Sequence, residues 1–195
     1  MDRRKFTVAA FAALIGSAAA TPAFARIFYN PDTNKWEERE ATSNGRRYKT
    51  IKKEVVPYET TFKVGTIVVE TAERRLYLVL PEGKALKYGI GVGRDGFTWT
   101  GQHKITRKAE WPGWTPPAAM RKRVPDLPAY MPGGPQNPLG ARALYIGSTL
   151  YRIHGTSEPW TIGQAVSSGC IRLTNEDVID LYDRAKVGAL VVVHH

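Results

Sequence analysis

The chain has 195 residues, which suffices for one domain with a proper hydrophobic core and is short for two. Its formal net charge of +10 favours an anionic partner such as a membrane surface or a cell-wall polymer, although a solvated basic surface without a specific partner explains the charge equally well. The chain has no basic helix pattern and no RNA-binding aromatic motif, which argues against nucleic acid as a partner.

The first 25 residues have the pattern of a secretory signal peptide. Charged residues 2–5 are followed by an apolar run from Phe6 to Ala20, and Ala23-Phe24-Ala25 matches a cleavage site. The run is short for a membrane anchor and rich in alanine, so we expect an exported mature protein without a membrane span. Arg3 and Arg4 are also typical of the twin-arginine route, so both Tat and Sec export stay open.

Residues 26–61 are polar, mixed in charge and without sustained periodicity, and they carry a basic cluster from Arg46 to Lys53. We expect an arm or linker here, either a mobile tail or a tether to the cell wall. A domain is predicted over residues 62–195.

From Gly65 onward the chain changes to short β-branched and aromatic runs that are separated by turn residues. These runs predict strands at residues 66–70, 75–80, 85–92, 143–146, 150–153 and 189–193. Because they are closely spaced without helices between them, we expect a mainly β fold with an antiparallel or mixed sheet.

The segment Gly91 to Gly96 satisfies the G-x-G-x-x-G pattern of dinucleotide-binding loops. Such a loop must lead from a strand into a helix, whereas Phe97 to Gly101 predicts a strand or a turn. We therefore expect a tight turn here and no nucleotide cofactor.

Residues 108–140 are the least regular part of the predicted domain and contain Trp111, Trp114 and several prolines and glycines. A stretch of this length either covers a substrate site or forms a static coil whose tryptophans pack on the core.

A helix is predicted after Thr174. Thr174 and Asp177 form a capping box, and Val178, Leu181 and other apolar residues follow at helical spacing.

Cys170 is the only cysteine of the chain, follows Ser167-Ser168-Gly169 and lies just before the predicted helix. His154 ends an apolar, strand-like run and is followed at once by Gly155. Exported proteins use cysteines in pairs to form disulfides, so a single thiol is either buried or used chemically. Each residue alone is more often structural than catalytic.

Together the two residues could supply nucleophilic catalysis. A free thiol has a pKa of about 8.5, so an imidazole is needed to form thiolate at neutral pH. If the chain after Cys170 is extended, Arg172 shares its face while Ile171 and Leu173 face the opposite way. One cysteine and four scattered histidines do not supply a zinc site, so we expect no metal.

In order, His154-Gly155-Thr156 and residues 167–173, followed by Asn175 and Asp177, resemble the signature of the L,D-transpeptidase catalytic domain, also called the YkuD domain. Residues 114–117 and 137–140 resemble segments of Gram-negative members, including enzymes that join lipoproteins to peptidoglycan. The resemblance covers residues 61–193.

This resemblance implies a mixed sheet arranged as a sandwich or closed sheet, with one or two short helices, in a periplasmic enzyme without cofactors. It implies a cysteine nucleophile at Cys170 and a base at His154, with the Gly155 carbonyl orienting the imidazole. The amides of Gly169 and Cys170 would form the oxyanion site, and Arg172 would support the thiolate or a substrate carboxylate. Substrate-binding residues would be Trp111, Trp114, Asn137, Ser167 and Ser168.

The implied substrates are peptidoglycan stem peptides as donor and acceptor, with an outer-membrane protein or lipoprotein as another acceptor. Many members carry a second histidine where this chain has Ser168, so His154 would transfer protons alone. Two alternatives stay open: an L,D-carboxypeptidase with water as the acceptor, and a cell-wall-binding module without chemistry.

Overall fold

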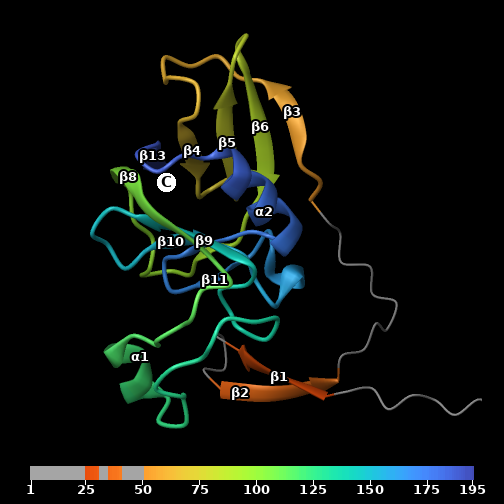
Figure 1. The fold of residues 1–195 in the computed structure, drawn as a ribbon, viewed down its shortest axis with the longest axis vertical. Helices are drawn as coiled ribbons and strands as arrows, with labels where there is room; N and C mark the ends of the chain where they lie inside the picture. The colour runs from red at the N-terminus through yellow and green to blue at the C-terminus, as the bar shows by residue number, and fades with distance from the viewer. Residues whose placement is uncertain (1–24, 31–34, 41–50) are drawn as a thin grey trace, which may run out of the picture.

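The computed structural model describes residues 25–30, 35–40 and 51–195, and within them the chain is mostly β (Figure 1). Nine strands form one curled, mixed sheet, with two α-helices and one short 3-10 helix in the described residues. The predicted mainly β fold with a mixed sheet is therefore confirmed. Most of the predicted signal peptide, residues 1–24, lies outside the described residues.

The large sheet has the strand order β12-β10-β9-β8-β13-β4-β5-β6-β3. Its pairings are antiparallel except for β10 with β12 and β13 with β4, which are parallel. The strands are β3 (Glu54–Pro57), β4 (Ile67–Glu70), β5 (Arg75–Leu80), β6 (Lys84–Gly89), β8 (Gly101–Glu110), β9 (Arg142–Ile146), β10 (Arg152–His154), β12 (Ile171–Arg172) and β13 (Leu190–His194).

Four further strands of the described residues lie outside this sheet. The strands β1 (Ala25–Asn30) and β2 (Lys35–Glu40) pair as an antiparallel hairpin, and β7 (Val92–Gly93) pairs in parallel with β11 (Ala165–Ser167). The segment 26–61, expected from its sequence to be an arm, thus contributes most of a hairpin and the edge strand β3. Neither the hairpin nor β3 was predicted, because the sequence of residues 26–61 has no sustained strand periodicity.

Strand β8 was also missed by the sequence reasoning, although it lies in the middle of the large sheet. Only Ile105 in this strand is buried, and most of its other side chains are polar or charged and reach solvent. A ladder of backbone hydrogen bonds to β9 and β13 holds the strand, so the sheet does not need an apolar pattern there.

The hydrophobic core lies between the sheet and α2 (Asn175–Arg184), and the apolar residues of β10 and β12 take part in it. Thr174 caps α2 as predicted, because its Oγ1 accepts a hydrogen bond of 3.1 Å from the Asp177 amide. Val178 and Leu181 of α2 are fully buried against Ile153 and Ile171. The helix therefore packs against the buried face of β10 and β12.

The glycine-rich segment at residues 91–96 leads into β8 and not into a helix, which agrees with the predicted absence of a dinucleotide loop. Gly91 instead forms a bridge with Arg172, with hydrogen bonds of 2.9 Å in both directions between their backbones. A Cβ at residue 91 would lie 3.0 Å from the Thr161 carbonyl oxygen, so glycine permits this close approach.

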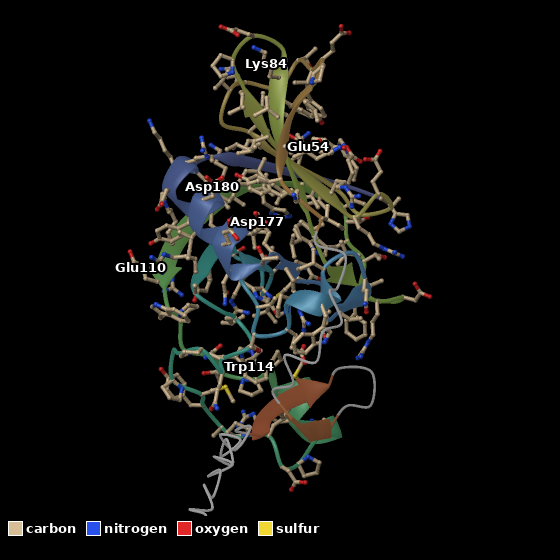
Figure 2. All side chains as sticks on the ribbon, turned by 90° about the vertical axis from the view of Figure 1, so that its right-hand side faces the viewer. Glu54, Lys84, Glu110, Trp114, Asp177 and Asp180 are labelled. Atoms are coloured by element: carbon tan, nitrogen blue, oxygen red, sulfur yellow. The ribbon has the colours of Figure 1, made fainter. Side chains whose placement is uncertain are left out.

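Residues 111–140 contain α1 (Ala118–Arg123) and a small apolar cluster of their own. Trp114, Val124, Leu127 and Leu139 are buried in this cluster, and Trp114 exchanges two backbone hydrogen bonds of 2.8 Å with Met131. Figure 2 shows Trp114 in the lower part of the molecule, at the end opposite Lys84. Of the two alternatives that the sequence left open, a substrate-covering insertion and a static coil packed on the core, the segment resembles the insertion in having a helix and an apolar cluster of its own.

Candidate active site

A cleft of about 390 Å³ lies between the insertion and the end of the sheet that carries β10 and β12. Its wall includes Cys170, His154 and Arg172, the three residues in which the sequence placed the chemistry. Side chains of the insertion form the other wall, and the whole lining consists of Phe97, Trp114, Pro117, Met120, Pro138, Leu139, Leu150, Tyr151, Arg152, His154, Ser167, Ser168, Cys170 and Arg172.

The parallel pairing of β10 with β12 brings the candidate nucleophile and base together. Ile153 lies opposite Ile171, and His154 lies opposite Arg172. Ile171 and Leu173 are buried in the core, whereas Cys170 and Arg172 face the cleft. The predicted alternation of faces after Cys170 is thus present in the structure.

The imidazole of His154 is almost fully buried, with 3% of the residue exposed. Its Nδ1 donates to the Gly155 carbonyl oxygen at 2.6 Å, because a carbonyl can only accept. Burial lowers the pKa of His154 to about 3, and the positive charge of Arg172 acts in the same direction. The ring is therefore neutral at physiological pH, with Nε2 as the nitrogen that can take a proton.

The turn before Cys170 requires a glycine. Gly169 has a φ of +100°, and a Cβ there would lie 2.4 Å from Cε1 of Tyr151. The Ser167 hydroxyl closes the turn, since Ser167 Oγ donates to the Cys170 carbonyl at 2.5 Å and accepts from the Gly169 amide at 3.2 Å. The Gly169 amide is thus already engaged, and the Cys170 amide donates to no residue in the described part of the chain.

Two aromatic residues that the sequence reasoning did not single out hold this turn from outside. The indole Nε1 of Trp99 donates to the Gly169 carbonyl at 2.8 Å. The same indole stacks on the ring of Tyr151, with 4.6 Å between centroids and 2° between planes. The turn that carries Cys170 is therefore tied to the strand that carries His154 through a rigid aromatic pair.

Arg172 forms a buried ion pair that the sequence did not reveal. Its Nη1 lies 3.4 Å from Oε2 of Glu158, and both side chains are about nine-tenths buried. The positive charge expected to support a thiolate or a substrate carboxylate is thus balanced by an acid of the protein. Glu158 lies 14 residues before Arg172 in a connecting segment, where no sequence pattern marked it.

The sequence model of the YkuD domain, described as the L,D-transpeptidase catalytic domain, matches residues 65–193. The chain belongs to this family. It is 42% identical over 152 residues to the Probable L,D-transpeptidase ErfK/SrfK of Escherichia coli, covering 74% of this chain and 48% of that protein. The chain therefore spans about half the length of this curated relative.

Two solved structures extend the comparison. L,D-transpeptidase 3 of Mycobacterium tuberculosis shares the fold at 19% identity, with a TM-score of 0.51 over 68% of this chain and 61% of that chain. A Brucella melitensis protein described as a probable carnitine operon oxidoreductase is 46% identical, with a TM-score of 0.51 over 73% of this chain and 93% of that chain. The glycine segment at 91–96 gives no support to a nucleotide-dependent redox activity in this chain, since no helix follows it.

Within this YkuD domain, two of the predicted substrate-binding residues are not brought to the cleft. Trp111 does not line it, is 43% exposed and donates its backbone N–H to the Ala141 carbonyl at 2.8 Å. Asn137 is buried, and its side chain bonds the backbone of Met131, Pro132 and Leu139. Asn137 therefore holds the insertion loop together, whereas Trp114, Ser167 and Ser168 do line the cleft.

Asn175 was part of the family signature, but the sequence gave it no role. Its Oδ1 accepts hydrogen bonds from the amides of Ala141 at 2.9 Å and Thr156 at 3.2 Å. A Cβ at Gly140 or Gly155 would lie 2.2 or 2.3 Å from this oxygen. Asn175 thus joins α2 to the segments on both sides of the His154 site, which explains the two glycines.

Among the described residues, no group of three or more histidine, cysteine, aspartate or glutamate side chains could hold a metal ion. No helix in the same parts of the chain is long and apolar enough to cross a membrane.

Proposed function

We propose that the protein is an exported cysteine L,D-transpeptidase that acts on peptidoglycan stem peptides. The observation that carries this proposal is the placement of Cys170 and a neutral His154 in one cleft, with His154 on β10 and Cys170 directly before its parallel partner β12. A cell-wall-binding module would not need a thiol, an imidazole and a strained glycine turn ordered around one cavity.

In the first step, Nε2 of His154 takes the proton of the Cys170 thiol as the sulfur attacks a carbonyl carbon of the donor stem. The carbonyl belongs to the L-centre of the third stem residue, meso-diaminopimelate. The new carbon–sulfur bond forms, the carbon–nitrogen bond to the terminal D-alanine breaks, and the leaving amine takes the proton back from His154. The Cys170 amide donates to the oxyanion during this step.

In the second step, an amine attacks the thioacyl-enzyme, gives its proton to His154 and releases Cys170. An amine of a neighbouring stem gives a 3-3 crosslink, and an amine of an outer-membrane protein or lipoprotein gives a protein anchored to the wall. Dividing one acyl transfer into two steps lowers the barrier of each.

The apolar wall of the cleft supports transfer over hydrolysis. Trp114, Met120 and Leu139 belong to the insertion at residues 111–140 and line the same cleft as Cys170. Apolar surface around a thioester disfavours a free water molecule, whereas a bound acceptor stem brings its own amine. We assign the insertion the role of shielding the intermediate.

This function takes place in the periplasm, after residues 1–25 are removed by the export machinery. The large sheet of the mature protein then includes β3 from residues 26–61, and the positive charge of the chain suits an anionic cell-wall polymer.

The intact mass of the mature protein after incubation with a tetrapeptide stem tests the proposal. We expect an increase equal to the stem minus its terminal D-alanine, which is lost in Cys170→Ala and formed slowly in His154→Ala. Cys170→Ser serves as a matched control that keeps the size of the side chain. A folded wild-type protein that forms no adduct would support the wall-binding module instead.

The same experiment with and without an acceptor peptide separates the two enzymatic alternatives. A crosslinked product that grows with acceptor concentration identifies a transpeptidase. Release of the tripeptide at a rate that does not depend on acceptor identifies an L,D-carboxypeptidase.

A further inference from the structure

Arg152 lies on the cleft face of β10, although the sequence reasoning gave it no role. Ile153 is fully buried in the core, so its neighbours Arg152 and His154 face the opposite side of the strand. Both of these side chains line the cleft. Arg152 is therefore a cation on the same wall as the candidate base.

Arg152 and Cys170 both line the cleft, and each directly precedes the first residue pair of the ladder between β10 and β12. Ile153 lies opposite Ile171 in a parallel ladder, so one step back along both strands leads to Arg152 and Cys170. The sulfur of Cys170 is 4.0 Å from the Leu150 carbonyl oxygen, which puts it at the start of β10. Paired strands are about 4.8 Å apart, so an arginine side chain spans this separation easily.

Arg152 and Arg172 differ in how their charges are matched. The guanidinium of Arg172 faces Glu158 at 3.4 Å in a buried pair. No carboxylate of the described residues lies within 4.0 Å of Arg152, and no hydrogen bond joins its guanidinium to another described residue. Its Nε is buried without a hydrogen-bond partner in that part of the chain.

An aromatic ring holds Arg152 in place without neutralising it. The guanidinium carbon of Arg152 lies 5.3 Å from the centroid of Tyr145, and that of Arg107 lies 3.6 Å from the same centroid. Both arginines pair with Tyr145 across neighbouring strands. Such stacking orients the guanidinium and leaves its N–H groups able to bind an anion.

We propose that Arg152 binds the free carboxylate of the C-terminal residue of the donor stem. This inference rests on the proposed function and adds how the site chooses its donor. Only one residue separates this carboxylate from the attacked carbonyl, and one residue spans about 3.5 Å. A carboxylate bound to Arg152 therefore keeps the attacked carbonyl in the part of the cleft that Cys170 lines.

The chemistry of the stem offers a second carboxylate, at the end of the diaminopimelate side chain. That group lies beyond a four-carbon chain from the attacked centre, whereas the C-terminal carboxylate is one residue away, within the cleft that Arg152 and Cys170 both line. Arg152 thus selects stems that end one residue after the attacked carbonyl. A stem that is longer by one residue lacks a carboxylate at this place and is a poor donor.

The rate of adduct formation on Cys170, measured by intact mass, tests the assignment with three donors. One is the tetrapeptide stem, one carries a C-terminal amide, and one carries an amide on the diaminopimelate side chain. We expect the C-terminal amide to slow acylation of the wild type at least about tenfold, since a charge-assisted bidentate contact is lost. The side-chain amide should react like the unmodified stem.

The variant Arg152→Gln should acylate slowly with the unmodified stem and should no longer distinguish it from its C-terminal amide. Arg152→Lys should recover part of this preference, because it restores the charge without the fork of two donors. Arg107→Gln is the matched control, since it removes the other arginine that stacks on Tyr145. Arg107 is exposed and does not line the cleft. The control variant should keep the wild-type preference.

The outcomes separate this inference from the function on which it rests. Equal rates for the acid and its C-terminal amide in the wild type would overturn the role of Arg152 while acylation itself stands, and this needs no variant to fold. The role of Arg152 would also be overturned if a folded Arg152→Gln variant still reacted faster with the free acid than with its C-terminal amide. The same holds if only the amide on the diaminopimelate side chain slowed acylation of the wild type. Absence of any Cys170 adduct in the wild type would refute the proposed function.

Discussion

The buried, neutral His154 makes the stability of the fold depend on pH in a direction that can be calculated. In the folded protein the pKa of His154 is lowered to about 3, mainly by burial, whereas in the unfolded chain it returns to its ordinary value of 6.5. Between these two values the unfolded state binds one more proton than the folded state. Stability from this group is therefore present above pH 6.5 and is lost as the pH falls toward 3.

The size of the effect between pH of about 7.5 and about 5 depends almost only on the unfolded chain. About 1.5 pH units of this range lie below 6.5, and each unit costs about 1.36 kcal/mol, so the free energy of unfolding should fall by about 2 kcal/mol. The result holds for any folded pKa well below 5. It tests the burial of the imidazole directly.

Urea unfolding of the wild type and of His154→Gln, at several pH values in this range, measures the effect. The difference in unfolding free energy between the two proteins should change by about 2 kcal/mol, with the wild type losing more in acid. The pKa of Asp177 is raised by burial, but its titration is common to both proteins and cancels in the difference. Ile153→Val, a core change on the opposite face of β10, controls for a general loss of stability. A His154→Gln protein with the pH dependence of the wild type would refute the reasoning.

Two further predictions concern the segments that hold the site. Gly169→Ala should reduce the rate of Cys170 acylation, followed by intact mass, at least about hundredfold. The reason is that a Cβ at residue 169 would lie 2.4 Å from Tyr151 and that φ is +100° there. An acylation rate equal to that of the wild type would contradict the need for glycine in this turn. Asn175→Ala should lower the free energy of unfolding in urea by about 2 kcal/mol, because two partly buried amides lose their acceptor, whereas Thr174→Ala, which removes a helix cap, should cost about 1 kcal/mol. Equal losses for the two variants would show that Asn175 acts only at the helix end.

Patterns that depend on neighbouring residues could be predicted from the sequence. The cap at Thr174 and the two faces around Ile171 follow from local geometry, and the structure has both. Six of the nine strands of the large sheet were predicted for the same reason, since their β-branched and aromatic residues form short runs between turn residues. Cys170 and His154 were found because the only cysteine of the chain and a histidine at the end of an apolar run each have a glycine as an immediate neighbour.

Long-range contacts could not be predicted. Glu158 neutralises Arg172 only because a connecting segment returns to β12, and Trp99 reaches Gly169 across 70 residues. Strand β8 was missed because backbone hydrogen bonds hold it, and its side chains carry no apolar pattern. The hydrogen bonds of Asn137 to its own loop could not be predicted either, because a polar loop residue can bond the loop's backbone as well as a substrate.

The short strand β12, which follows the nucleophile, is bonded on both sides. One side pairs with β10, and the other exchanges two hydrogen bonds with Gly91, in the segment that only resembles a nucleotide loop. Local opening at this place must break two sets of bonds at once, so the sulfur keeps its position between turnovers. Under the proposed function, an acyl group attached to this sulfur can therefore wait for an acceptor that is itself fixed in a wall and arrives slowly. In such an enzyme the lifetime of the intermediate matters as much as the speed of the first attack.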